Sequence, residues 1–346
     1  MQASSAITLA PHRLPMFGSS AGVKFYLITT EEVEPLVQID RSGGYADYRC
    51  VVVDRTTNLE DVIAEELGTP AHILVVTPGI LFESPPPHIV GEQRKLAVMA
   101  CGSTPTSVEA ICHFLKVIEE SDPAGMSSRA EGIFRLLEET EYLFVEDAKL
   151  GTAAKFAHKA GPYEWFEQLG ELDWGGQQLV PAGELSVLPL FHGNYDSDQR
   201  LEINGTIALH GQPILHSGRP SFLEADQTRI YDRLRIMAEK PVICEIENGQ
   251  IVSAAGIDGE SNDAAQMLNC LFEVDSRYRT IWEVGFGINS QHTMYAGNVG
   301  MNEVHGGKFG ALHWGLGLTP WTQFHMDIVC PNIRVSAAEG KRILGP

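Results

Sequence analysis

The stretch from Glu283 to Asp327 places the strongest constraint on how this chain folds. It carries His313 and the pair His325 and Asp327 in strand-like segments that are rich in glycine. Side chains two residues apart on a β-strand point to the same face, so His325 and Asp327 converge while Met326 faces the opposite side. Imidazole and carboxylate groups that converge in this way form a metal-ligand pair. The stretch therefore predicts strands that carry a metal site.

In the first half of the chain, short apolar runs alternate with helical patterns. Continuous apolar runs are typical of strands buried in a parallel sheet, and they occupy residues 23–29, 50–54, 72–77 and 95–101. Apolar residues spaced by three and four predict helices over 59–67, 107–120 and 127–139, the last two with Thr106 or Ser107 and Ser127 or Ser128 as N-caps. We expect an α/β scaffold domain with a mostly parallel sheet over residues 1–150. Neither a Gly-x-Gly-x-x-Gly turn nor a P-loop occurs there, which disfavours nucleotide binding.

From about Gly151 onward, short runs typical of strands are separated by glycines, as in β-hairpins. Residues 152–157 alternate as a strand, and Asn248-Gly249 between two alternating runs is the strongest hairpin signal, because a type I′ turn needs positive φ at both positions. A helix is predicted over residues 262–274. We therefore expect residues 151–346 to form a second, α+β domain that is largely antiparallel and carries the metal site.

The charge of the chain excludes some classes of partner. Forty-five acidic residues against 25 basic ones give a formal charge of −20, which repels nucleic acid and anionic membrane surfaces. The first residues lack a basic and hydrophobic leader, and no run approaches the ~18 apolar residues of a membrane span. The six cysteines include no Cys-x-x-Cys pair, so we expect free thiols and a cytoplasmic protein.

The order of five candidate ligands resembles that of the thermophilic metallo-aminopeptidases of the aminopeptidase T and aminopeptidase S type. These residues are Glu184 after Gly183, Glu283, His313 before a Gly-Leu-Gly run, and the final His325-x-Asp327. The likeness covers about residues 151–340, whereas residues 1–150 share only the α/β style and are shorter than that family's first domain. It implies a homodimer that binds one or two divalent ions (zinc, cobalt or manganese) and cleaves an N-terminal peptide bond or related amide. Glu283 is then a ligand or the catalytic base.

The chain departs from this family at two places. The family has a tyrosine shortly after the histidine that corresponds to His313, and here that place falls at Pro320, which has no hydroxyl or N–H to stabilise an oxyanion. Tyr295 is the candidate substitute. The connection from His313 to His325 is also much shorter than in the family. These departures favour an alternative, a non-catalytic peptide-binding protein, with or without metal, that serves a peptide-modifying pathway.

A second alternative is an iron-dependent, ring-cleaving dioxygenase. The architecture is also similar to that of 2,5-dihydroxypyridine dioxygenases, whose third iron ligand is a histidine where this chain has Glu283. A facial triad of two histidines and one carboxylate would then have to recruit His313, which leaves Glu184 without a role. The remaining candidates are interpreted as surface, turn or capping residues: His192, His210, His216, His292, His305 and Glu303.

Overall fold

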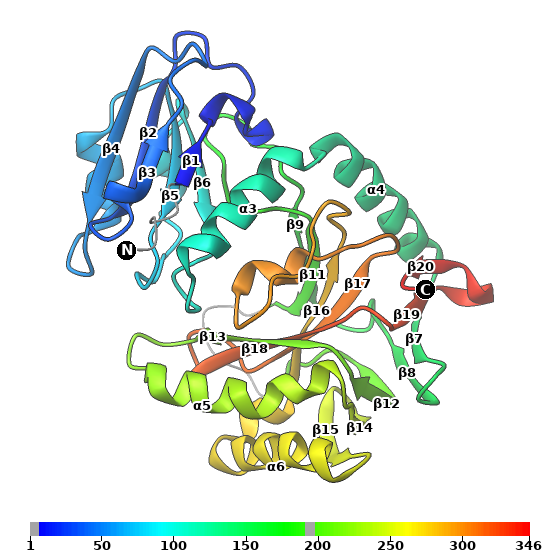
Figure 1. Ribbon diagram of the computed structural model, residues 1–346. Coiled ribbons are helices and arrows are strands. Elements are labelled where there is room, and N and C mark those ends of the chain that lie inside the picture. Colours follow the sequence, from blue (N-terminus) through cyan, green and yellow to red (C-terminus); the bar gives the residue numbers. More distant parts are fainter. Residues whose placement is uncertain (1–6, 191–197) are drawn as a thin grey trace. The chain divides into compact units, whose positions relative to one another are not determined.

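The computed structural model describes residues 7–190 and 198–346 (Figure 1). The chain forms two compact units. The first unit combines Met1–Met126, Gln168–Gly183 and Tyr295–Met301, and the second combines Ser127–Glu167, Glu184–Met294 and Asn302–Pro346. The predicted domain boundary at residue 150 lies inside the first segment of the second unit. His192, which the sequence places among surface or turn residues, lies outside the described residues.

In the described part of the first unit, a five-stranded parallel sheet confirms the predicted α/β character. Its order is β10-β6-β5-β2-β4. The strands are β2 (Lys24–Thr30), β4 (Asp47–Val53), β5 (Ala71–Val76), β6 (Arg94–Met99) and β10 (Gln177–Val180). The first four overlap the predicted apolar runs, but β4, predicted as a buried strand, lies at the sheet edge, where Val52 is 50% exposed. β10 was expected in the second domain, and its pairing with β6 is a contact between distant residues that local patterns do not encode.

Local capping signals placed the first-unit helix α3 (Val108–Glu120) correctly. Ser107 is its N-cap, and its Oγ accepts a hydrogen bond from the Ala110 N–H at 3.2 Å. The helix buries Phe114 and Leu115 against the core. The other elements of this unit are short: α1 (Leu59–Asp61), continued by a π-turn over Val62–Glu66, α2 (Pro87–Val90), and the parallel pair β1 (Ile7–Leu9) and β3 (Val37–Ile39).

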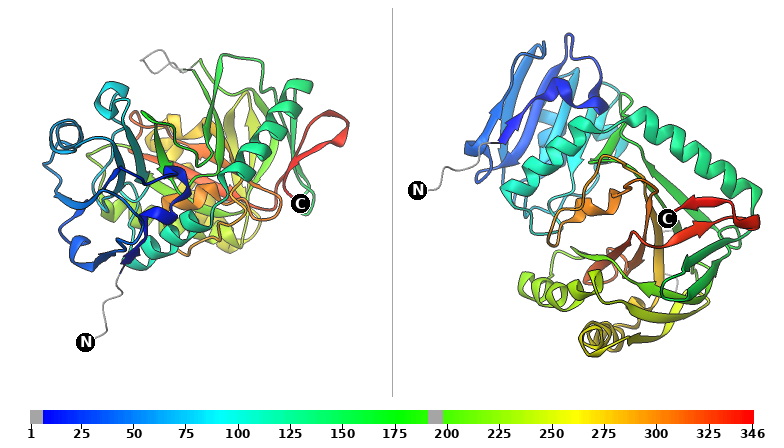
Figure 2. Two further views of the ribbon diagram at one scale, coloured as in Figure 1. Left: turned by 90° about the horizontal axis from the view of Figure 1, so that it is seen from above. Right: turned by 45° about the vertical axis from the view of Figure 1, so that its right-hand side comes forward.

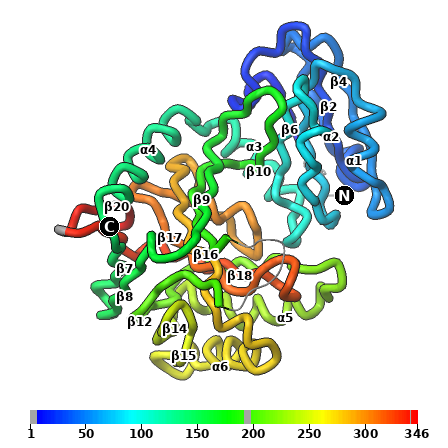
Figure 3. Tube along the Cα trace, turned by 180° about the vertical axis from the view of Figure 1, so that it is seen from behind, coloured from blue at the N-terminus to red at the C-terminus, as the bar shows by residue number. Residues whose placement is uncertain are grey.

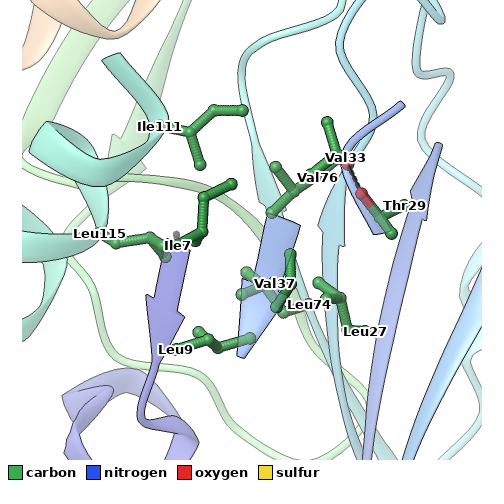
Figure 4. A pocket seen from close by; sticks show the side chains of 10 residues that line it. All are labelled: Ile7, Leu9, Leu27, Thr29, Val33, Val37, Leu74, Val76, Ile111 and Leu115. Atoms are coloured by element: carbon green, nitrogen blue, oxygen red, sulfur yellow. Dashed lines mark hydrogen bonds between the residues drawn. The ribbon is translucent and has the colours of Figure 1, made fainter. Parts of the chain in front are cut away.

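An apolar hollow lies inside the first unit (Figure 4). The one polar side chain among those that line it, Thr29, donates its hydroxyl hydrogen to the Val76 carbonyl at 2.7 Å. The hollow is lined by Ile7, Leu9, Leu27, Thr29, Val33, Val37, Leu74, Val76, Ile111 and Leu115. This lining offers no acid, base or metal ligand, so the hollow does not provide a site for chemistry.

The described part of the second unit contains two sheets and confirms the predicted antiparallel character. One has the order β13-β18-β17-β16-β11-β9, in which β13 to β11 pair antiparallel and β9 lies at the edge. Figure 3 labels four of its strands, β18, β17, β16 and β9. Its strands are β9 (Tyr163–Gln168), β11 (Glu184–Pro189), β13 (Gln212–Ser217), β16 (Ile281–Gly287), β17 (Ala311–Leu316) and β18 (Phe324–Cys330). We call it the six-stranded sheet.

The other sheet has the order β15-β14-β12-β8-β7-β19-β20. Its strands are β7 (Leu143–Asp147), β8 (Thr152–Phe156), β12 (Ile203–Leu209), β14 (Val242–Glu247), β15 (Gln250–Gly256), β19 (Arg334–Ser336) and β20 (Arg342–Leu344). The right-hand view of Figure 2 shows the red C-terminal hairpin of β19 and β20, which adds to this sheet by pairing with β7.

The predicted hairpin and helix of the second unit are both present. Asn248 and Gly249 have φ of 49° and 73°, as a type I′ turn requires, and join β14 to β15. The helix is α6 (Gly259–Val274), and it begins three residues earlier than predicted because Asp258 and Ser261 form a capping box. It lies beside α5 (Glu224–Leu234), which the sequence analysis did not predict (Figure 1).

The remaining long helix, α4 (Pro123–Glu139), begins four residues before the predicted start at residue 127. Across residues 7–190 and 198–346, no helix is both long enough and apolar enough to span a bilayer.

Candidate metal centre

The five predicted ligands lie on four adjacent strands of the six-stranded sheet. Glu184 begins β11, Glu283 lies on β16, His313 on β17, and His325 and Asp327 on β18. The structure therefore brings together residues as distant in the chain as Glu184 and Asp327, which are 143 positions apart.

The strand register places these side chains on one face. Glu283 pairs with Gly315, and Gly315 pairs with Asp327, so Glu283 and Asp327 lie on the same face of three neighbouring strands. His313 pairs with Gly285, which is two residues after Glu283 and shares its face. Glycines thus occupy the places between the ligands, where a larger side chain would fill the space.

His313 lies between two glutamates. Its Nε2 is 3.2 Å from Glu184 Oε1 and 3.9 Å from Glu283 Oε1. The side chains of Glu184 and His313 are 5% and 1% exposed, so this group is nearly removed from water. Glu184, Glu283 and His313 each offer one ligand atom within 4.8 Å of the others, and we call this group the first position.

His325 lies between two carboxylates in the same way. Its Nε2 is 3.4 Å from Glu283 Oε2 and 3.1 Å from Asp327 Oδ1. Glu283, His325 and Asp327 form a second group of ligand atoms within 4.8 Å of one another, the second position. The two oxygens of Glu283 are therefore directed at different histidines, and the carboxylate joins the two positions.

A backbone hydrogen bond orients His325. Its Nδ1 lies 2.7 Å from the carbonyl oxygen of Gly317. A carbonyl only accepts, so Nδ1–H is the donor, and Nε2 keeps its lone pair in the neutral imidazole. This arrangement, in which one ring nitrogen is held by the backbone while the other faces carboxylates, is typical of metal-ligating histidines.

Two residues that the sequence did not indicate as ligands, His216 and Glu303, also belong to the cluster. His216 Nε2 is 3.2 Å from Asp327 Oδ2 and 3.5 Å from Glu303 Oε2. The interpretation of His216 as a surface or turn residue is wrong: it lies on β13, directly opposite His325 in the register, and its side chain is 13% exposed. Glu303, expected to cap or face solvent, lies on the short 3-10 helix Gly300–Val304 with a side chain that is 14% exposed.

No motif in the sequence identified these two residues. The β13 segment, Gln212–Ser217, carries no His-x-Asp pattern, and only its pairing with β18 brings His216 to the site. His292 follows a turn, as its sequence position indicates, and its N–H donates to the Asn289 carbonyl at 3.3 Å, but it is only 1% exposed and therefore not a surface residue. Its own carbonyl oxygen lies 2.9 Å from His305 Nδ1.

The charged groups of the cluster shift one another's pKa. Burial lowers the pKa of His216, but hydrogen bonds with Asp327 and Glu303 outweigh burial and raise it to about 9. Burial is likewise outweighed at His313 and His325, whose neighbouring carboxylates raise the pKa well above its ordinary value.

The carboxylates shift in opposite directions. Burial, with the charge of Glu303, raises the pKa of Glu184 to about 7. Burial also acts to raise the pKa of Glu283 and Asp327, but the histidines outweigh it and lower the pKa of Glu283 to about 2 and that of Asp327 further below its ordinary value. Glu283 and Asp327 are therefore ionised, as ligands must be.

Proton release should accompany cation binding. At pH 7 the imidazoles with raised pKa, among them His216 with a pKa of about 9, hold protons that a cation must displace. We expect the apparent affinity for zinc to increase as the pH rises from 7 towards 9, because the proton of His216 is then lost without the cation. Calorimetric titration in buffers with different ionisation enthalpies measures the protons released. Affinity that stays constant over this range would contradict the protonation assigned to the network.

The candidate substitute for the missing tyrosine belongs to the first unit. The ring of Tyr295 lies 5.2 Å from that of His113 and 6.1 Å from that of Phe114, and it packs against the core there. Pro320 follows β17 after a cis peptide bond with Thr319. The catalytic part suggested for Tyr295 stays a prediction.

Comparison with known proteins gives likeness at the level of the fold. The chain matches no family model and no curated protein sequence. Among solved structures it is similar to 2,5-dihydroxypyridine dioxygenase from Pseudomonas putida KT2440, with a TM-score of 0.55 and 14% identity over 96% of this chain and 94% of that one. It also matches AmpT from Thermus thermophilus, with a TM-score of 0.49 and 12% identity over 96% and 95% of the two chains. At 14% identity, the first match shows that the chain shares a fold with the dioxygenase.

Proposed function

We propose that the second unit is a metal-dependent hydrolase that cleaves an N-terminal peptide bond or a related amide with water activated between two divalent cations. The observation that carries the proposal is the placement of Glu283, whose Oε1 is 3.9 Å from His313 and whose Oε2 is 3.4 Å from His325. A carboxylate whose two oxygens face two imidazole-bearing groups is the bridging ligand that a two-metal site requires.

The charge of the cluster supports divalent cations. Four carboxylates, Glu184, Glu283, Glu303 and Asp327, lie together with side chains that are 2–14% exposed. Buried carboxylates are stable only when they are paired with positive charge or coordinate a metal. Two divalent cations bring four positive charges and would balance them. Zinc, cobalt and manganese accept this mixture of carboxylate and imidazole ligands.

The chemistry of amide hydrolysis follows from this ligand set. Bound divalent cations lower the pKa of water to about 7 and polarise a carbonyl oxygen. Glu184 and His313 would hold a cation at the first position, His325 and Asp327 would hold one at the second, and Glu283 would contribute one oxygen to each. The surplus negative charge of the chain suits a substrate with a free amino group, such as a peptide N-terminus. The homodimer implied by the family resemblance stays a prediction.

Hydrolysis of aminoacyl p-nitroanilides tests the proposal. We expect cleavage that stops after dialysis against a chelator and returns when zinc, cobalt or manganese is added, because the water is activated only when cations are bound. The N-acetylated anilide is the matched control, since it differs only in lacking the free amine, and it should not be cleaved. Peptide binding without cleavage under any of these metals would contradict hydrolysis and support the non-catalytic peptide-binding alternative.

One observation favours a ring-cleaving dioxygenase as a second candidate. His216 and His325 each have Nε2 within 3.2 Å of Asp327, at its Oδ2 and Oδ1 respectively, so two imidazoles flank one carboxylate. This is the ligand composition of a mononuclear iron facial triad. This triad does not include His313. The triad considered from the sequence, by contrast, used His313 as its second histidine. Oxygen consumption with iron(II) and a dihydroxylated aromatic ring, and no anilide cleavage, would select this candidate.

A further inference from the structure

The two positions do not use all the ligands of the cluster. Among the described residues, a third group offers ligand atoms within 4.8 Å of one another: His216, Glu303 and Asp327. Its imidazole lies between two carboxylates, with Nε2 at 3.2 Å from Asp327 Oδ2 and 3.5 Å from Glu303 Oε2. This repeats the composition of the other positions, which also consist of one imidazole and two carboxylates.

Asp327 connects this group to the second position as Glu283 connects the first two. Its Oδ1 is 3.1 Å from His325 and its Oδ2 is 3.2 Å from His216. Each of the two shared carboxylates therefore directs its two oxygens at different histidines. The second group therefore shares one carboxylate with the first, Glu283, and another with the third, Asp327.

The separations are those between ligands of one cation. Two atoms that are each about 2.0–2.2 Å from an ion and subtend about 90–110° there lie about 2.8–3.6 Å apart. The separations of 3.2 and 3.5 Å around His216 fall in this range, as do 3.4 and 3.1 Å around His325. By this measure the third group is as well formed as the second position.

We propose that His216, Glu303 and Asp327 form a third divalent cation position, next to the two on the six-stranded sheet. The inference rests on the proposed function only in taking the first two groups as cation positions. Two cations already balance the four carboxylates, so the third binds most weakly, and hydroxide or an anionic substrate group completes its charge balance. Cobalt and zinc are the cations that suit its ligands.

Counting bound cobalt tests the third position directly, without measuring activity. The metal-free protein is titrated with cobalt(II) under equilibrium dialysis and elemental analysis, and anomalous scattering from cobalt-soaked crystals locates the ions. We expect three ions in the wild type and two in His216→Ala, with the ion near His216 missing. His210→Ala is the matched control, because it makes the same change near the start of the same strand, outside the cluster, and should keep three.

The other outcomes overturn the proposal in distinct ways. Two ions in both the wild type and His216→Ala would show that His216 is no ligand. Two in the wild type and one in His216→Ala would show that His216 completes one of the first two positions. If circular dichroism shows that His216→Ala does not fold, Glu303→Gln replaces it. This variant is nearly isosteric with the wild type and is also expected to bind two ions. Absence of anilide cleavage with three ions bound would refute the hydrolase and leave the third position standing.

Discussion

Glu283→Gln is expected to remove most of the hydrolytic activity, with a fall of about 10²–10⁴-fold in kcat/KM for an aminoacyl anilide. The variant keeps the volume of the side chain and removes its negative charge. Glutamine keeps one acceptor oxygen and cannot bridge two cations as a carboxylate does, so at least one of the positions that share Glu283 loses a ligand. Elemental analysis should show fewer than two tightly bound cations per chain at a concentration that saturates the wild type.

Glu247→Gln is the matched control for this variant. Glu247 is an exposed residue at the end of β14, outside the cluster, and its loss should change neither metal content nor activity. A Glu283→Gln protein with wild-type metal content and activity would show that the carboxylate neither bridges cations nor handles protons. Loss of activity with full metal content would instead assign it the role of base.

The sequence predicted those parts of the site that follow local rules. His325 and Asp327 converge because residues two apart on a strand share a face, and this needs no knowledge of neighbouring strands. Their meeting with Glu283 and His313 was expected from the order of motifs, and adjacent strands bring it about. His216 was missed because its place opposite His325 depends on the pairing of β13 with β18, which no local pattern specifies.

In the fold, too, features set by local sequence were predicted, whereas contacts between distant strands were not. The N-cap at Ser107 and the Asn248-Gly249 turn are set by backbone chemistry within four residues, and the structure confirms both. The addition of β10 to the sheet of the first unit joins Val180 to Met99, across 81 positions of sequence. Glu303 illustrates the same limit, because a glutamate on a short 3-10 helix has no periodic pattern that marks it as buried.

Gly285 gives rise to the second large prediction. A β-carbon placed on Gly285 would overlap the His313 ring, with Cδ2 at 2.6 Å and the Cε1 and Nε2 atoms closer still. Gly315 is similar, since its β-carbon would lie 2.6 Å from that of Glu283 and 3.1 Å from His325 Cε1. Distances under 3.0 Å essentially never occur for real β-carbons, so one side chain must move. These glycines are required by the ligands that cross over them.

Gly285→Ala is therefore expected to displace the His313 ring and weaken cation binding at the first position by at least about 10–100-fold, with a comparable loss of hydrolysis. Cobalt titration and anilide cleavage measure both effects. Gly132→Ala is the matched control: Gly132 lies within α4, a β-carbon added there would meet no atom within 4 Å, and the variant should gain about 0.5–1 kcal/mol of stability because alanine favours helix. Unchanged cobalt affinity in Gly285→Ala would mean that His313 does not bind a cation from the place it occupies, and the first position would then have to be abandoned.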